Sequence, residues 1–140
     1  MKIKYLLLSG ALVAIIACGY AWFQYNRSAP SANDMPVKET LTATELLSAF
    51  TTDEAAATTR YVGSTEQVIQ VSGTIRSVDT TGDSLTNVVL ETGNDLAGVV
   101  CEFTGGNAGK TWKPGDAATI RGICTGLLMD VVLVRCVAVE

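Results

Sequence analysis

The stretch QVIQVSGTIRSVD, Gln67 to Asp79, alternates apolar and polar residues along its length. Ile69, Val71, Gly73 and Ile75 fall on one side, and polar residues occupy most of the positions between them. A period of two predicts a β-strand with one buried face. A glycine inside such a strand indicates a bulge or a sharp bend, which a strand needs when it serves two sheets of a small barrel. This stretch therefore predicts the central strand of the domain.

Four more segments carry strand signals, and turn residues such as Gly, Pro, Asn and Asp separate them. The predicted strands are 85–91, 96–103, 117–124 and 131–139. Five strands at this spacing predict a mainly β domain, either a small barrel or a sandwich.

Two short helices are expected ahead of the strands. Thr42 stands three residues before Glu45, which is the spacing of a capping box, and predicts a helix over about 43–50. We expect Thr52 to cap a second helical stretch, and Gly63 to end it.

The N-terminus is expected to be a membrane anchor. No charge interrupts the segment 5–23, and a helix of that length spans roughly 28 Å, close to the hydrocarbon thickness of a bilayer. Lys2 and Lys4 precede it and favour a cytoplasmic N-terminus. We therefore expect a signal anchor over 1–25, a flexible tether over 26–41 and a domain over 42–140, which is placed outside the cytoplasmic membrane.

A lipoprotein is the alternative, because Ile15 to Cys18 reads IIAC and fits a signal that ends at a lipid-modified cysteine. Against it, the residues after Cys18 stay aromatic and apolar through Phe23, whereas a lipoprotein tether turns polar at once. A cleaved, unanchored form is the third option. Both leading interpretations put the domain outside the cytoplasmic membrane.

The chain resembles the tRNA-anti-like family of OB-fold proteins, which are membrane-tethered or lipoprotein-like bacterial proteins, mostly uncharacterised. The resemblance rests on ELLSAFTTDEAAATTRYVG, VSGTI and GVVCEF in that order, followed by GDAATIRGICTGLLMDVVLVRCVAVE. It implies a five-stranded Greek-key OB barrel that follows an N-terminal helical segment. It does not imply tRNA binding, because a fold does not fix a function.

Charge argues against nucleic acid as the partner. From Lys38 onward there are seven basic and thirteen acidic residues, a net charge of −6, whereas phosphate binding needs a basic surface. The domain's aromatic residues are Phe50, Tyr61, Phe103 and Trp112. We therefore expect a binding module for a protein or a small polar ligand, with single-stranded nucleic acid or an oligosaccharide on the OB face as the alternative.

The domain's cysteines are Cys101, Cys124 and Cys136, and alternation points all three to the apolar side, with Val132 and Val134 beside Cys136. The chain has no histidine, and long spacings separate the cysteines, so we expect no metal, no cofactor and no catalytic thiol. Nor can two acids be placed on one face, so no enzyme is expected. The cysteines are expected to pack or to form one disulfide, Cys124–Cys136 first. The OB strand order implies Cys101–Cys136 as the second choice.

Two loops are candidates for ligand contact. The first, 79–84, holds Asp79 and Asp83, and the second, 125–131, holds Thr125 and Asp130. OB folds often bind ligands through the second of these loops. The favoured interpretation is structural: Asp130 accepts backbone N–H bonds and fixes its turn, and Asp79 and Asp83 belong to a solvated turn.

Overall fold

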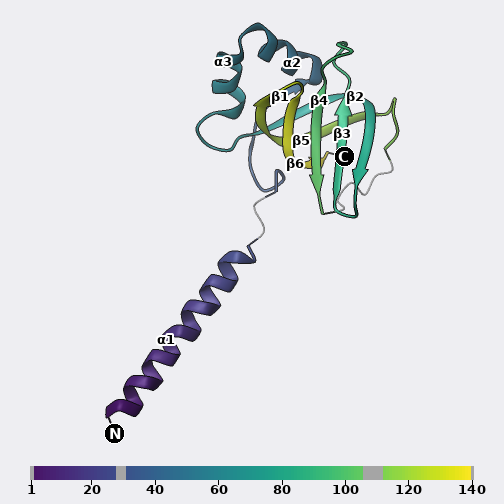
Figure 1. The fold of residues 1–140 in the computed structure, drawn as a ribbon. Helices are drawn as coiled ribbons and strands as arrows, with labels where there is room; N and C mark the ends of the chain where they lie inside the picture. The colour runs from purple at the N-terminus through teal and green to yellow at the C-terminus, as the bar shows by residue number, and fades with distance from the viewer. Residues whose placement is uncertain (1, 28–30, 106–111, 140) are drawn as a thin grey trace.

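The structure is a computed structural model that describes residues 2–27, 31–105 and 112–139. A long N-terminal helix leads to a compact domain of short helices and strands (Figure 1). The helical elements are α1 (Lys2–Tyr25), α2 (Ala43–Thr52), α3 (Glu54–Ala57) and the π-helical turn η1 (Thr58–Val62). The strands are β1 (Val37–Thr42), β2 (Val68–Thr81), β3 (Leu85–Leu90), β4 (Val99–Thr104), β5 (Ala117–Leu127) and β6 (Val131–Ala138).

Five of the strands close a barrel in the order β2-β3-β4-β6-β5, because β5 also pairs with β2. The long strand β2 makes this closure possible. Its first half, 68–74, pairs with β5, and its second half, 75–81, pairs with β3. The prediction that Gln67 to Asp79 serves two sheets is confirmed, as is the mainly β barrel with helices before it.

The bend in β2 lies next to Gly73 rather than at it. The register of β2 against β3 shifts between Ile75 and Ser77. Gly73 has a packing role instead, because a Cβ there would lie 3.3 Å from the Cβ of Ala43 at the start of α2. The glycine thus admits the helix close to the strand, and the bulge follows just after it.

The segment expected to be a flexible tether carries a sixth strand. β1 pairs in parallel with the first half of β2, and Val37 lies opposite Val68. Ala32 is fully buried against Val68 and Ile123, in a small cluster on the outside of the barrel. The burial of β1 alternates with a period of two, but the sequence hides this because the charged Glu39 stands between Val37 and Leu41 on the inner side.

The capping box predicted at the start of α2 is confirmed. Thr42 donates its backbone N–H to Glu45 at 2.8 Å, and its hydroxyl accepts from the Glu45 backbone at 3.2 Å. The second helical stretch begins differently from the prediction, since Asp53 rather than Thr52 caps α3. Gly63 ends the stretch as expected, with φ +64°.

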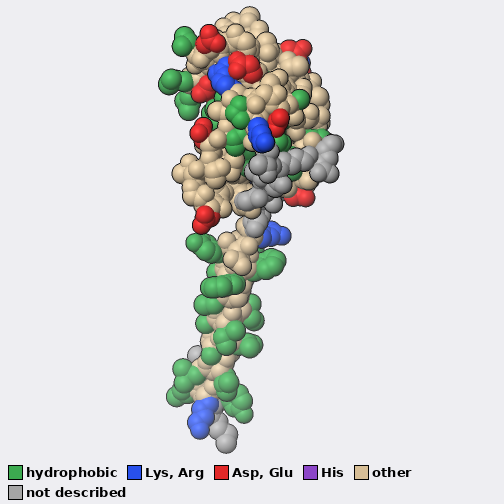
Figure 2. Space-filling view, turned by 90° about the vertical axis from the view of Figure 1, so that its right-hand side faces the viewer, with side chains coloured by type: hydrophobic (Ala, Val, Ile, Leu, Met, Phe, Trp, Pro, Cys, Tyr) green, Lys and Arg blue, Asp and Glu red, His purple; other side chains and the backbone are tan. Residues whose placement is uncertain are grey.

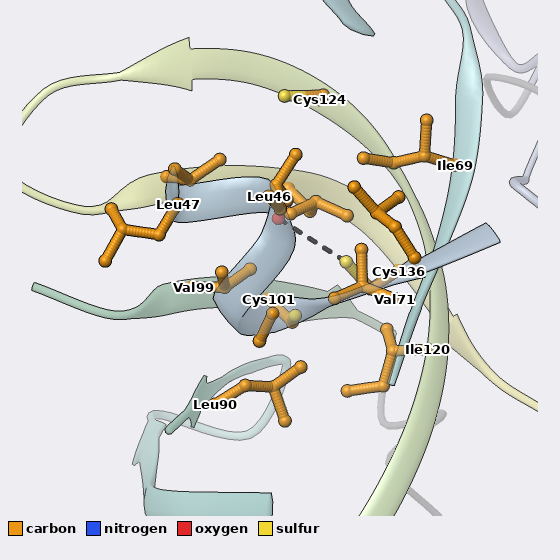
Figure 3. Close-up of a cluster of buried hydrophobic side chains, with 14 of the residues drawn as sticks. Leu46, Leu47, Ile69, Val71, Leu90, Val99, Cys101, Ile120, Cys124 and Cys136 are labelled. Atoms are coloured by element: carbon orange, nitrogen blue, oxygen red, sulfur yellow. Dashed lines mark hydrogen bonds between the residues drawn. The ribbon is translucent and has the colours of Figure 1, made fainter. Parts of the chain in front are cut away.

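The helix α2 covers one end of the barrel and completes the core. Leu46 and Phe50 are almost completely buried, and they belong to one cluster with barrel residues such as Val71 and Leu133. Figure 3 shows Leu46 surrounded by side chains from several strands. Full burial of each such side chain contributes about 1.5–3 kcal/mol, so α2 is part of the domain and not an appendage.

The first helix has the length and composition to cross a membrane. It offers 23 consecutive residues, Ile3–Tyr25, and none of the assessed window is buried in the structure. Figure 2 shows hydrophobic side chains all along the visible side of α1. A secretory signal has the same properties, so α1 is either a span or a signal-like segment.

Candidate ligand-binding loops

Two loops meet at one end of the barrel because the strands that follow them are parallel neighbours. β4 and β6 pair in parallel, with Val99 opposite Val131, so the loop before each strand starts at the same place. The β3–β4 loop (91–98) therefore lies against the β5–β6 loop (128–130). Two hydrogen bonds join them: the Gly98 N–H donates to Oδ1 of Asp130 at 2.7 Å, and the Val131 N–H donates to the Gly98 carbonyl at 3.1 Å.

Asp130 thus accepts a backbone N–H bond, but the donor lies on the other loop rather than in its own turn. Within its own turn only the backbone carbonyl of Asp130 is used, as the acceptor for the Leu128 N–H at 3.1 Å. No Cβ fits at Gly98, since it would lie 2.9 Å from Cγ1 of Val89. The contact therefore needs two things: no Cβ at residue 98, and a side-chain oxygen at residue 130 that accepts the Gly98 N–H.

A second set of hydrogen bonds joins the β3–β4 loop to Arg76 of β2. Arg76 of β2 donates to both carboxylate oxygens of Glu91, at 2.8 and 2.6 Å, and to the Asn94 carbonyl at 2.7 Å. The Arg76 hydrogen bond is the main reason why the pKa of Glu91 falls from 4.5 to about 2. The planar guanidinium therefore fixes both the start and the middle of the loop.

Bonds inside the loop complete its structure. Thr92 is buried, and its hydroxyl donates to the Ala97 carbonyl at 2.6 Å. The side-chain oxygen of Asn94 accepts from the Leu96 N–H at 2.9 Å. A loop with this many internal bonds presents its exposed side chains from an ordered backbone.

The two loops expose apolar side chains. Leu96 is 88% exposed, Leu128 is 88% exposed and Met129 is 80% exposed; elsewhere in the described part of the domain no large hydrophobic side chain is so exposed. We call these three residues the loop patch. Exposed apolar clusters on a soluble domain often mark an interaction surface.

Sequence reasoning overlooked the loop patch, although a signal was present. The alternation pattern places Leu96 at the start of the predicted strand 96–103, and Leu128 and Met129 fall in the predicted loop 125–131. In DLAG and GLLMD, large apolar residues stand in turn segments. Such residues at turns, where no strand periodicity explains them, point to an exposed contact.

The predicted ligand loops do not form one site. Asp79 and Asp83 are exposed at the end of β2 and in the β2–β3 turn. Thr125 and Asp130 belong to the β5–β6 hairpin, where the Thr125 hydroxyl donates to the Val132 carbonyl at 3.1 Å. β2 and β5 pair only through residues 68–74 of β2 and 117–123 of β5. In the other direction around the barrel, β3, β4 and β6 lie between these two strands. Asp79 and Asp83 therefore lie apart from the loop patch.

The outer face of β3 and β4 offers nothing on which a base could stack. Its cross-strand pairs are Asn87 with Glu102 and Val89 with Val100. Three of the domain's aromatic side chains, Phe50, Tyr61 and Phe103, are buried. The fourth, Trp112, packs edge-on against Phe103, with 5.2 Å between the two ring centroids. Within the described residues, these pairs bring together two valines, an amide and a carboxylate, with no cation and no aromatic ring, unlike the basic, aromatic grooves that bind single strands.

The structure contains none of the predicted disulfides, and all three domain cysteines are buried free thiols. Leu133, not Cys136, lies opposite Cys124. Cys136 instead meets Gly122, where a Cβ would lie 2.6 Å from its sulfur. The Cys136 thiol donates to the Leu133 carbonyl at 3.4 Å, the dashed line in Figure 3, and Cys124 lies apart from it. Burial raises the pKa of Cys124 to about 11 and, with the nearby Cys101 thiol, raises that of Cys136 as well.

The predicted alternation fails in β6 for a clear reason. Val131 and Leu133 are buried, whereas Val132 and Val134 are only half-buried. The inward positions at the start of β6 are therefore odd-numbered, although the buried Cys136 is even-numbered. Arg135 has φ +52°, and the register shifts on this side of the ladder with β5. This bulge returns Cys136 to the interior one residue late.

A separate hollow of about 520 Å³ lies between α2 and the α3–η1 segment. Ala49, Ala57 and Tyr61 are among its apolar lining residues, and Thr44 and Ser48 are among its polar ones. It is an open groove far in sequence from the loop patch. Among the described residues no three His, Cys, Asp or Glu side chains gather as a metal site would require.

The strand order and the shared strand β2 define an OB fold, a five-stranded closed barrel. The chain belongs to the tRNA_anti-like family, whose model matches residues 1–138. Among the solved structures that resemble it is one from Klebsiella pneumoniae subsp. pneumoniae MGH 78578, described as a "putative nucleic acid-binding lipoprotein". The TM-score is 0.56 at 19% identity, over 71% of this chain and 91% of that one. No curated protein matches the chain.

Proposed function

We propose that the chain is a membrane-anchored, non-catalytic binding module that presents its OB domain outside the cytoplasmic membrane and binds a protein through the loop patch. The observation that carries the proposal is the patch itself. Leu96, Leu128 and Met129 are exposed on two loops that hydrogen bonds hold together. Leaving such side chains in water gives the fold no stability, so a contact that covers them is the simplest reason for their position.

The anchored, external location draws on α1. Ile3–Tyr25 is long enough to span a bilayer, and the lysines before it favour a cytoplasmic N-terminus. A lipidated Cys18 would also leave the domain at the membrane surface. In either case the connection is short: six residues lie between Tyr25, the end of α1, and the buried Ala32, and the seven Cα-to-Cα steps reach at most about 25 Å.

Two features of the chain's chemistry argue against catalysis. The chain lacks histidine, and burial raises the thiol pKa of Cys124 and Cys136, which makes these two thiols poor nucleophiles. Two carboxylates beside the loop patch are already engaged: Glu91 binds Arg76, and Asp130 binds Gly98. They serve as structural acceptors of hydrogen bonds.

The test is a crosslinking pull-down of the full chain from its native membrane, with three forms compared. We expect the parent and a control with Thr44→Ala and Ser48→Ala on α2 to capture the same protein. The double variant Leu128→Ser/Met129→Ser should lose it. Capture that is equal in all three forms, or a reproducible turnover lost on changing Asp130, would remove the proposal.

Single-stranded nucleic acid is the second candidate, and the description of the Klebsiella neighbour favours it. The charge of −6 and the absence of a stacking face among the described residues speak against it. Anisotropy of labelled DNA and RNA oligonucleotides at low salt decides the matter. Micromolar binding that weakens as salt rises would make nucleic acid the ligand.

A further inference from the structure

We infer that the loop patch accepts a cationic amphipathic polypeptide segment, one that carries leucine-like side chains on one side and lysine or arginine beside them. This inference rests on the proposed function, and it names the chemistry of the partner. Three features of the two loops lead to it: the apolar side chains, the fixed backbone beneath them and the sign of the surrounding charge.

The apolar side chains set the first requirement for the partner. Leu96 projects from the β3–β4 loop, and Leu128 and Met129 project from the β5–β6 loop. The Gly98 to Asp130 bond keeps the two loops together at 2.7 Å, so one partner can touch both. Leucine and methionine side chains adapt to varied apolar surfaces, which suits the irregular apolar face of a helix or an extended segment.

The fixed backbone makes the contact favourable. Arg76 holds the β3–β4 loop at Glu91 and Asn94, and Thr92 holds it at Ala97. Val131 and Leu128 hold the other loop through their backbone N–H groups. Because these backbones are already ordered, a partner does not have to order them on binding.

The charge selects the partner further. Glu91, Asp95 and Asp130 lie on or next to the two loops, and Arg76 is paired with Glu91 alone among them. Glu91 neutralises Arg76 in a two-bond ion pair. Asp95 is exposed, and its charge adds to those of Glu91 and Asp130 around Arg76. The rim is therefore acidic, which attracts a basic segment and repels nucleic acid and anionic lipid headgroups.

The experiment uses the full chain in nanodiscs of zwitterionic lipid. The ligand is a synthetic amphipathic peptide of leucine and lysine, and the comparison peptide has glutamate in place of every lysine. Empty nanodiscs give the background. The readout is the rate at which dilute peroxide oxidises Met129, followed by mass spectrometry, because an exposed methionine reacts and a covered one is protected. Met35, which packs against Val68 and Ile123, is the internal control.

We expect the leucine–lysine peptide to slow Met129 oxidation and the leucine–glutamate peptide to leave it unchanged. Leu128→Ser and Asp95→Lys should each raise the peptide concentration needed for half protection, by about tenfold and by a few-fold respectively. Thr44→Ala on α2 should match the parent. Met35 should react at one rate throughout.

Equal protection by both peptides, or no protection by either, overturns the inference. Met129 that is already protected in the nanodisc without peptide overturns it too, because the lipid surface is then the occupant. A native partner captured through Leu128 and Met129, together with no effect of the leucine–lysine peptide, leaves the proposed function standing and removes only the cationic chemistry. Failure of both experiments removes both.

Discussion

Gly98 donates its backbone N–H to Asp130 at 2.7 Å across a sequence separation of 32 residues. The bond exists because β4 and β6 run parallel and side by side, which places the loops before them in contact. The bond joins the β3–β4 loop and the β5–β6 loop into one surface.

Replacing Asp130 with Ala leaves the buried Gly98 N–H without its acceptor, at a cost of about 1–3 kcal/mol in the free energy of unfolding. Asp130→Asn keeps an oxygen acceptor in the same place and should cost less than about 1 kcal/mol. Urea denaturation of both variants measures the difference. Equal loss in the two variants would mean that the charge of Asp130, and not the bond to Gly98, matters.

Acid should loosen the β3–β4 loop through Glu91. Its pKa in the folded protein is about 2, below the ordinary 4.5, so the ionised form is favoured by the fold. This stabilisation is fully present above about pH 4.5 and is lost as the pH falls toward about 2. The NMR signals of Leu96 should shift over that range, and Glu91→Gln should abolish the shift.

Glu45→Gln is the control for the acid experiment. The pKa of Glu45 is also lowered, by its hydrogen bonds with Thr42, but this group caps α2. Its replacement should leave the titration of Leu96 as in the parent. A Leu96 signal that does not respond to Glu91→Gln would show that Glu91 does not control the loop.

Gly122→Ala should destabilise the barrel by about 1–3 kcal/mol, because the new methyl group would lie 2.6 Å from the Cys136 sulfur and 3.0 Å from Leu133 Cβ. Cys136→Ala removes the sulfur, so the double variant should recover part of the loss. A cycle of thermal or urea unfolding measures this coupling. Val88→Ala on β3 is a control expected to add simply to Gly122→Ala.

The unfolding midpoint of the protein should not depend on reductant. Because all three are free thiols and Cys124 lies opposite Leu133, a reducing agent should leave the unfolding midpoint unchanged. A midpoint that falls on reduction would establish a disulfide and contradict the packing described for Cys136.

The sequence predicted those features that local periodicity and turn chemistry control. The alternation around Gly73, the Thr42–Glu45 capping box and the five barrel strands are all local patterns, and all are confirmed. β1 was missed because its pairing with β2 depends on a distant strand and not on its own alternation. The inner face of β6 was wrong by one residue because the bulge at Arg135 is a backbone event with no glycine to mark it.

The candidate site is harder to predict from the sequence than the fold is. Asp130 was correctly marked as an acceptor of a backbone N–H bond, but its donor, Gly98, could be found only once β4 and β6 were known to be parallel. Asp79 and Asp83 are the other candidate loop in the sequence, and the topology places that loop apart from Asp130. Contacts between distant loops follow from strand order, which periodicity does not encode.

The anchor makes a prediction about location. If α1 spans the membrane with its N-terminus inside, protease added outside the cytoplasmic membrane should release the domain from intact cells, and the purified chain should retain its first residues. Intact mass spectrometry reads the N-terminus. A mature N-terminus at a diacylated Cys18 would establish the lipoprotein form, and a domain protected from external protease would contradict the external location.

The most direct measurement of the central claim places a photo-crosslinking amino acid at Met129 in the full chain and illuminates intact cells. The matched control carries it at Thr44, which is exposed on α2 at the groove beside α3. Binding through the loop patch predicts a discrete protein adduct from position 129, which weakens when Asp130→Ala is added, and none from position 44. Adducts of equal yield from both positions, or an adduct from 44 alone, would contradict it.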